Sequence, residues 1–281
     1  MSLGVFLAVL LAASLHACWN VLVKGANDKP LASASVCAGC GVIGLACLPF
    51  VPVPDAASWP WGIASGLSHV AYFTMIGRIY RTADLSVAYP ITRGTAPLLT
   101  TAVAAAYIGE LPSANALLGI LGLCAGILAL AVDGIRRGGF DKASLAGALT
   151  TALIICFYTM VDGLGGRASG GHPFSYSAYI QIAAAVFYLP VFCLLRRRGA
   201  LAALARALPR GLAGGASSFS AYSIAIYAMT IAPIGLIAAL RETSVLFAAA
   251  FGALVLGERF GPARYVAAAL VACGLMAMKA G

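Results

Sequence analysis

The stretch RGTAPLLTTAVAAAYIGE (residues 93–110) recurs in altered form as RETSVLFAAAFGALVLGE (residues 241–258). Each copy begins with an arginine inside an apolar run and ends in Gly-Glu, and the two share seven identities without a gap. The offset of 148 residues holds from residue 82 to residue 126 of the first copy. An internal repeat of this length indicates that the chain is built from two related halves.

The composition is that of a chain surrounded by lipid. Hydrophobic residues make up 62% of the 281 residues and charged residues only 10%, whereas a soluble domain has about 25% charged residues. The net charge of +9 comes from basic residues between apolar runs, without interleaved aromatic residues. We therefore interpret these residues as loop charges and predict no nucleic-acid partner.

Ten apolar segments are each long enough to cross a bilayer of about 30 Å. They lie near residues 3–23, 31–51, 59–79, 85–107, 113–132, 144–163, 174–195, 211–231, 234–256 and 262–279. Backbone polar groups must be satisfied within each span, so we expect every segment to be a helix. The first segment has no basic stretch before it and no cleavage signal after it, which predicts a retained helix.

Five segments precede the basic connector near residues 133–142, and five follow it. An odd number of spans in each half gives the halves opposite orientations in the membrane. The sequence thus predicts an all-α integral membrane protein with ten transmembrane helices, arranged as two inverted five-helix repeats around a central cavity. The repeats would comprise residues 1–137 and residues 138–281.

The loops on one predicted side of the membrane hold almost all of the loop lysines and arginines. Fourteen follow the odd-numbered segments, and only Arg167 and Lys279 lie on the other side. The positive-inside rule places the basic side in the cytoplasm. We therefore predict a multi-pass protein of the bacterial inner (plasma) membrane with both termini outside.

Arg93 and Arg241 are the residues that an apolar segment explains least. Each lies about 12 Å from the end of its segment, where a charge costs at least about 2.5–3.5 kcal/mol. Such residues usually mark a substrate or ion pathway, and the repeat would aim both arginines at one cavity. Two alternatives stay open, namely snorkelling to the interface and an internal ion pair, for which Glu242 is the local candidate for Arg241.

Two pairs of polar residues occupy matching places in the two halves. His16 and Asn20 lie four residues apart in the first segment, and Tyr158 and Asp162 do so in the sixth. This spacing puts each pair on one helix face. His16 is either a proton relay or a buried histidine bonded to backbone. Asp162 either carries a proton or binds a substrate amine, or else it contacts water near a helix end, which is the reading we favour.

Polar stripes interrupt the third and eighth segments. They contain His69, Tyr72 and Thr74 in one and Ser217, Ser218, Ser220, Tyr222 and Ser223 in the other. As a set they favour a wet cavity, whereas any single serine is better explained by hydrogen bonding between helices. Glu110 and Glu258, which end the repeated stretches, are interpreted as parts of the turns into the next helix.

No pattern for enzymatic chemistry is found. GxxxxGK[ST], GxSxG and HExxH are all absent, which excludes an ATP-driven pump acting alone. The eight cysteines lie inside apolar runs, and the one CxxC, at Cys37 and Cys40, lacks a second pair of ligands. We therefore predict free thiols, no cofactor, no metal site and no enzyme.

The turns GELP and GERFGP, with the Gly- and Ala-rich segments ALLGILGLCAGILAL and YVAAALVACGLMAM after them, resemble the drug/metabolite transporter (DMT) superfamily, specifically its ten-helix EamA-like family. The resemblance covers essentially the whole chain and implies alternating access without nucleotide hydrolysis. Arg93 and Arg241 are similar in placement to basic residues that hold phosphate in the sugar-phosphate exchangers of plastids. The small four-helix multidrug members use a glutamate in their first helix, where this chain has His16 and Asn20.

The resulting hypothesis is a secondary transporter for a small polar metabolite with an anionic group, such as an amino-acid-like zwitterion, an organophosphate or a phosphonate. The predicted substrate-binding residues are Arg93, Arg241, His16, Asn20, Tyr72, His69, Tyr158 and Tyr222, with Asp162 and Glu242 as coupling or charge-pair candidates. Protons or a counter-substrate are the expected coupling partners, and the protein would be a monomer or homodimer. The alternatives are an exporter of neutral or apolar compounds and a non-transporting scaffold subunit.

Overall fold

The computed structural model describes residues 1–82, 85–138, 142–256 and 262–280, and these form eleven α-helices and two short 3-10 helices. The first half contains α1 (Leu3–Lys24), α2 (Lys29–Cys47), η1 (Leu48–Phe50), η2 (Ala56–Ser58), α3 (Trp59–Thr82), α4 (Leu85–Ile108) and α5 (Ala114–Gly138). The second half contains α6 (Lys142–Arg167), α7 (Pro173–Arg196), α8 (Ala200–Ile231), α9 (Ile234–Arg241), α10 (Ser244–Leu256) and α11 (Pro262–Ala280).

Eight of the ten predicted segments each correspond to one long helix, and two predictions need correction. The eighth segment was expected to begin at residue 211, after a basic connector. Instead α8 begins at Ala200 and runs for 32 residues. The connector is rich in alanine and leucine, which favour helix strongly enough to outweigh the loop signal of its arginines.

The ninth segment was expected to be continuous from residue 234 to residue 256, but it is broken into α9 and α10. At the break the Glu242 N–H bonds to the Ala239 carbonyl and the Thr243 N–H to the Leu240 carbonyl, which are tighter bonds than those of an α-helix. The Thr243 hydroxyl also donates to the Leu240 carbonyl at 2.7 Å. The break therefore falls directly after Arg241.

Five helical spans among the described residues are long and apolar enough to cross a membrane, by length and composition. They are Leu3–Lys24, Lys29–Phe50, Ala114–Arg136, Lys142–Arg167 and Pro173–Arg196. Many large apolar side chains are exposed on the outer faces of the helices, among them Leu7, Leu11, Leu121 and Phe157. Such a surface suits contact with lipid chains. The count of ten spans stays a prediction.

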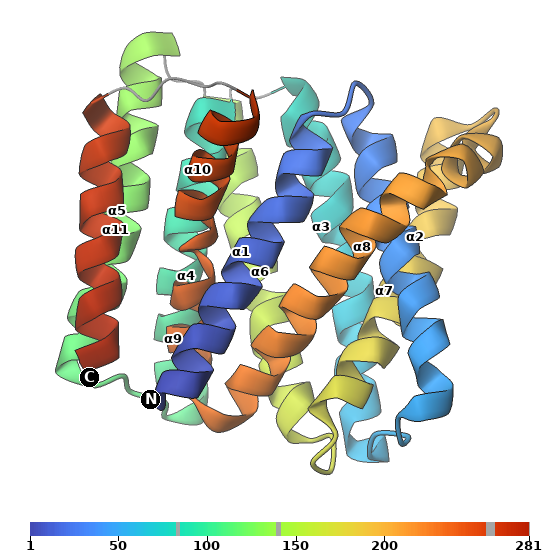
Figure 1. Cartoon of the computed structure of the whole chain (residues 1–281), viewed down its shortest axis with the longest axis horizontal. Helices are drawn as coiled ribbons and strands as arrows, with labels where there is room; N and C mark the ends of the chain where they lie inside the picture. The colour runs from blue at the N-terminus through green and yellow to red at the C-terminus, as the bar shows by residue number, and fades with distance from the viewer. Residues whose placement is uncertain (83–84, 139–141, 257–261, 281) are drawn as a thin grey trace.

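The helices form one bundle with both chain termini at the same end (Figure 1). Helices α5 and α11 lie side by side at one edge, and α2 packs against α7 and α8 at the other. Between these edges α1 packs on α8, α9 and α10, while α4 packs on α6 and α9. Apart from the contact of α4 with α5, the most extensive contacts thus join elements from different halves of the chain.

Glycines allow α2 and α8 to touch through their backbones. A Cβ atom added to Gly39 would lie 2.2 Å from the carbonyl oxygen of Gly211, and one added to Gly215 would lie 2.7 Å from the backbone of Gly39. No side chain fits between the two helices at these points. This packing through small residues is typical of helices in lipid.

All eight cysteines are free thiols, as predicted. Cys37, Cys40, Cys124 and Cys156 are buried, whereas Cys18 and Cys273 are exposed on the helix surfaces. The Cys40 thiol donates to the Gly215 carbonyl at 3.5 Å, close to the contact of α2 with α8. The buried cysteines therefore act as small packing residues.

Candidate substrate site

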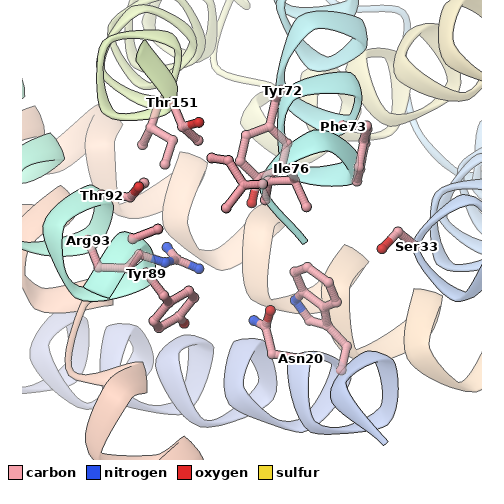
Figure 2. A pocket seen from close by; sticks show the side chains of 13 residues that line it. Asn20, Ser33, Tyr72, Phe73, Ile76, Tyr89, Thr92, Arg93 and Thr151 are labelled. Atoms are coloured by element: carbon pink, nitrogen blue, oxygen red, sulfur yellow. The ribbon is translucent and has the colours of Figure 1, made fainter. Parts of the chain in front are cut away.

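A cavity with three adjoining parts lies in the middle of the bundle. Arg93 lines the first and second parts, Arg241 the second and third, and Tyr72 the first and third. In the first part Arg93 and Tyr89 project from α4, Tyr72 projects from α3 and Asn20 from α1 (Figure 2). The three parts therefore adjoin one another at these shared side chains.

All eight predicted substrate-binding residues line this cavity. Asn20 lines the first part, and His16, His69 and Tyr222 line the third. Tyr158 lines the second and third parts, and Glu242 lines the second together with both arginines. Their role in substrate binding stays a prediction.

Arg93 is an internally paired cation. It is only 5% exposed, and its Nη1 lies 3.2 Å from Oε1 of Glu242, which is equally buried. Its Nη2 lies 2.6 Å from Nε2 of His16, and its guanidinium lies 5.4 Å from the centre of the Tyr89 ring. Helices α4 and α1 and the end of α9 therefore meet at this one side chain.

His16 is surrounded by hydrogen-bond donors at both ring nitrogens. Arg93 faces Nε2, and the Trp19 indole N–H lies 3.3 Å from Nδ1. Arginine and tryptophan side chains can only donate, so the nitrogen at the shorter contact, Nε2, must accept, and the imidazole is neutral in this arrangement. His16 thus bonds to an arginine rather than to backbone, and it cannot hold two protons while Arg93 stays in place.

Arg241 is placed differently from Arg93. Arg241 is the last residue of α9, and its guanidinium lies 5.0 Å from the centre of the Tyr222 ring. It is partly exposed and lines the cavity. Among the described residues no carboxylate lies within ion-pair distance of it. The alternative of a local ion pair between Arg241 and Glu242 is therefore not observed, because adjacent residues on a helix point in different directions.

The two halves differ at the position after each arginine. A Cβ atom added to Gly94 would lie 2.6 Å from the Leu128 side chain, so only glycine fits between α4 and α5. At the matching position the second half has Glu242, at the break between α9 and α10. One half therefore supplies a carboxylate that neutralises the arginine of the other half.

Asp162 is fully buried, contrary to the favoured expectation that it contacts water near a helix end. The Tyr222 hydroxyl donates a short hydrogen bond to its Oδ2, and the Tyr176 hydroxyl donates to its Oδ1 at 3.4 Å. It lies five residues before the end of α6, in the middle of packed helices rather than at their surface. Because Tyr222 stands between Asp162 and the cavity, Asp162 does not line the site.

Aromatic rings form part of the wall of the cavity. The His69 ring lies 4.8 Å from the Tyr158 ring, and the Tyr72 ring lies 5.6 Å from it. His69 is held in place by the Ser65 carbonyl, 2.9 Å from its Nδ1. Such rings offer faces that attract cations and edges that attract anions.

Sequence reasoning missed several lining residues, including Trp19, Ser33, Phe73, Tyr89 and Gln181. Aromatic residues in an apolar run do not reveal which way they face. Of the predicted serine stripe, Ser218 lines the cavity, Ser223 instead bonds to Ser177 at 2.8 Å, and Ser220 is exposed. Thr74 does not line the cavity, and its buried hydroxyl has no partner among the described residues.

Glu110 has the structural role that was predicted, although it does more than form a turn. One of its oxygens lies 2.5 Å from Nη2 of Arg167, and the other accepts from the Ile234 N–H at 2.8 Å. It thereby satisfies a free donor at the start of α9. The matching Glu258 lies outside the described residues.

The comparisons with known proteins identify the chain. Residues 142–279, which span almost all of the second half, match the sequence model of the EamA-like transporter family. The chain belongs to the EamA-like transporter family. This family is part of the DMT superfamily, and its members are multi-pass membrane transporters rather than enzymes.

The fold of this EamA-like protein is also found among solved structures. One crystal structure, whose description names no function, matches this chain with a TM-score of 0.74 and 20% sequence identity. The match covers 99% of this chain and 96% of the chain in that structure. At this identity the match shows the fold alone. No curated protein matches the chain.

Proposed function

We propose that this EamA-like protein is a secondary active transporter that moves a small polar metabolite with an anionic group across the bacterial inner membrane by alternating access. Amino-acid-like zwitterions, organophosphates and phosphonates are the candidate classes. The observation that carries the proposal is the Arg241 guanidinium, which lines the cavity without a carboxylate partner among the described residues.

An arginine in such a place is costly unless an anion neutralises it. Arg241 stacks over Tyr222, and this contact fixes its guanidinium while leaving its donors free for a ligand. A carboxylate or phosphate would accept two parallel hydrogen bonds from it. Arg93, which lines the same part of the cavity, is the second donor to such a group.

The aromatic wall defines what the rest of the substrate would meet. Tyr72, Tyr158 and Phe73 surround the third part of the cavity, and Asp162 does not reach it. A substrate amine would therefore rest on ring faces rather than on a carboxylate. In the zwitterion hypothesis the aromatic rings thus take the place of Asp162 as the partner of the substrate amine.

The packing of the bundle supports an inverted repeat as the basis for alternating access. The contact of α2 with α8 has its counterpart in that of α7 with α3, and the contact of α1 with α8 in that of α6 with α3. The contacts of α2 with α7 and of α5 with α11 each join a helix to its own equivalent. This pattern of pairs is the one that a two-fold relation between the two halves would produce.

One observation favours a second function, the export of neutral or apolar compounds. Arg93 is already neutralised by Glu242, and apolar side chains such as Ile76, Ile79 and Ile155 contribute to the first part of the cavity. In this function Arg241 would serve only to position Tyr222. A scaffold without transport is disfavoured, because it needs no cavity lined by two arginines.

A stability screen of the purified protein separates these functions. Carboxylates, amino acids, organophosphates, phosphonates, cationic drugs and neutral compounds would be tested for a rise in melting temperature. A ligand at about 100 times its Kd adds roughly 2.7 kcal/mol to the folded state. We expect anionic compounds to stabilise the wild type and not Arg241→Met.

The matched control is Arg198→Met, which removes a charge from an exposed residue after α7. It should keep the full response to anions. Stabilisation by neutral or cationic compounds alone, in the wild type and Arg241→Met equally, would contradict the proposal and support the second function.

A further inference from the structure

Glu242 is a buried carboxylate that uses only half of its bonding capacity. Its Oε1 accepts from Arg93 at 3.2 Å, which is longer than the 2.7–2.9 Å typical of a charge-assisted bond. Its Oε2 is buried and has no hydrogen-bond partner among the described residues. The pair is thus neither bidentate nor closely made, although both side chains are only 6% exposed.

The position of Glu242 allows it to leave Arg93. It lies between α9 and α10, outside the regular hydrogen bonding of either helix, and it lines the cavity together with Arg93 and Arg241. Discontinuous helices of this kind form the ion and substrate sites of many secondary transporters.

We propose that Glu242 holds the place at Arg93 that the anionic group of the substrate takes, and that Glu242 leaves Arg93 by taking up one proton. The inference rests on the proposed function, since it needs an anion that engages Arg93. It assigns the proton as the coupling ion and Glu242 as the group that carries it.

The charge balance of the cavity provides the reason. When an anion takes the Arg93 guanidinium, Glu242 becomes a buried charge without a counter-ion, which is among the least stable arrangements in a protein. A proton from the aqueous side forms an O–H bond on the carboxylate and removes that charge. One anion and one proton then enter together, so the net charge of the site does not change.

No other group near Glu242 can accept the proton unless Arg93 also moves. The groups that face Glu242 or share its cavity are Arg93 on α4, Arg241 on α9, His16 on α1, Tyr72 on α3, Tyr158 on α6 and Cys124 on α5. Tyr222 on α8 contacts Arg241. Of these, His16 is the rival proton acceptor, because its Nε2 also becomes free when Arg93 moves.

The test is a measurement of proton uptake by the purified protein in weakly buffered detergent solution. Acetate and methanesulfonate serve as probes, because each keeps its charge between about pH 6 and pH 8. We expect the wild type to take up about one proton for each anion bound. Its apparent affinity should then rise by up to about tenfold for each unit of falling pH.

Two variants assign the proton. Glu242→Gln should bind both anions with an affinity that does not change with pH, and it should take up no proton. Asp28→Asn removes a carboxylate from another arginine pair outside the cavity, so its anion binding and proton uptake should equal those of the wild type. Uptake that persists in Glu242→Gln would overturn the assignment and point to His16.

Two further outcomes separate the inference from the function on which it rests. Binding that needs Arg93 but brings no proton would overturn the inference, because Glu242 would then have moved to Arg241, and the proposed function would stand. Failure of both anions to bind would overturn the two together.

A measurement without any anion tests the proposal independently of whether acetate and methanesulfonate bind. In Arg93→Met the cation is gone, so infrared spectroscopy at neutral pH should show a protonated carboxyl group that is absent from the wild type and from Arg93→Met/Glu242→Gln. The lack of this band in Arg93→Met would also overturn the proposal.

Discussion

Glu110 and Arg167 join the two halves of the bundle at the ends of three helices. The Glu110 carboxylate lies 2.5 Å from the Arg167 guanidinium, and its second oxygen accepts from the first N–H of α9. Arg167 in turn donates to the carbonyls of Met229 and Ala232, at 2.9 and 3.2 Å, where α8 ends. One carboxylate from the first half thereby fixes the turn that leads into Arg241.

This arrangement predicts graded effects at Glu110. Glu110→Ala removes the cap and the ion pair and should destabilise the protein by about 1–2 kcal/mol, most of it from the cap, because the pair is partly exposed. Glu110→Gln keeps an oxygen for the Ile234 N–H and should lose less. Thermal unfolding in detergent measures both, and equal losses in the two variants would contradict the capping role.

Tyr222 has two separable roles, a hydroxyl bond to Asp162 and a ring under Arg241. Tyr222→Phe removes a donor from a buried carboxylate and should cost about 1–3 kcal/mol of stability while leaving anion binding at Arg241 intact. Thermal unfolding and anion titration measure the two effects. Tyr227→Phe, on the same helix but exposed, is the control and should change neither.

The contact between α2 and α8 should not tolerate a methyl group. Gly39→Ala would place a Cβ atom 2.2 Å from a backbone oxygen, so the helices must separate, at a cost of about 1–3 kcal/mol. Gly4→Ala adds the same group where nothing lies within 4 Å and should not destabilise α1. Comparison of the two melting temperatures tests the contact, and an equal effect of both would show that it does not exist.

Asp28 predicts a pH-dependent contribution to stability outside the membrane spans. Partial burial raises the pKa of this carboxyl, but bonds from Arg196 at 2.6 Å and from the Leu31 N–H at 3.0 Å outweigh it, so the pKa lies below its usual value. A lowered folded-state pKa means that the contribution is full above the unfolded value of about 3.9 and is lost as the pH falls through the folded value.

The variant Asp28→Asn keeps the cap of α2 and loses the ion pair. Its melting temperature should be lower than that of the wild type at neutral pH, and the difference should shrink at about pH 3, near the unfolded pKa. A difference that stays constant or grows in acid would show that the charge of Asp28 does not stabilise the fold.

The sequence predicted most of the helices and several of the polar residues that line the cavity, because a polar side chain within an apolar run has few places to go. It did not predict which charges would pair. Glu242 follows Arg241 in the chain, yet it reaches Arg93, which lies 149 residues away. The direction of a side chain at a helix break depends on how the halves pack, and no local pattern encodes that.

Tertiary packing also explains why the structure differs from the sequence-based predictions at Asp162 and at the break after Arg241. Asp162 seemed close to a helix end, but the tyrosines that bury it come from α7 and α8. The break after Arg241 depends on bonds made by Glu242 and Thr243, in a segment whose apolar pattern is continuous. Hydropathy therefore predicted the span, whereas tertiary packing determined its interruption.

The most direct test of the central claim is transport by Arg241→Met in proteoliposomes. The cargo would be the anionic compound that stabilises the wild type most. Loss of a charge-assisted bond worth about 1.5–3 kcal/mol should weaken binding roughly 10- to 100-fold, so uptake at sub-saturating cargo should nearly vanish. Arg198→Met should transport at the wild-type rate. Wild-type transport of the anion by correctly folded Arg241→Met would contradict the account.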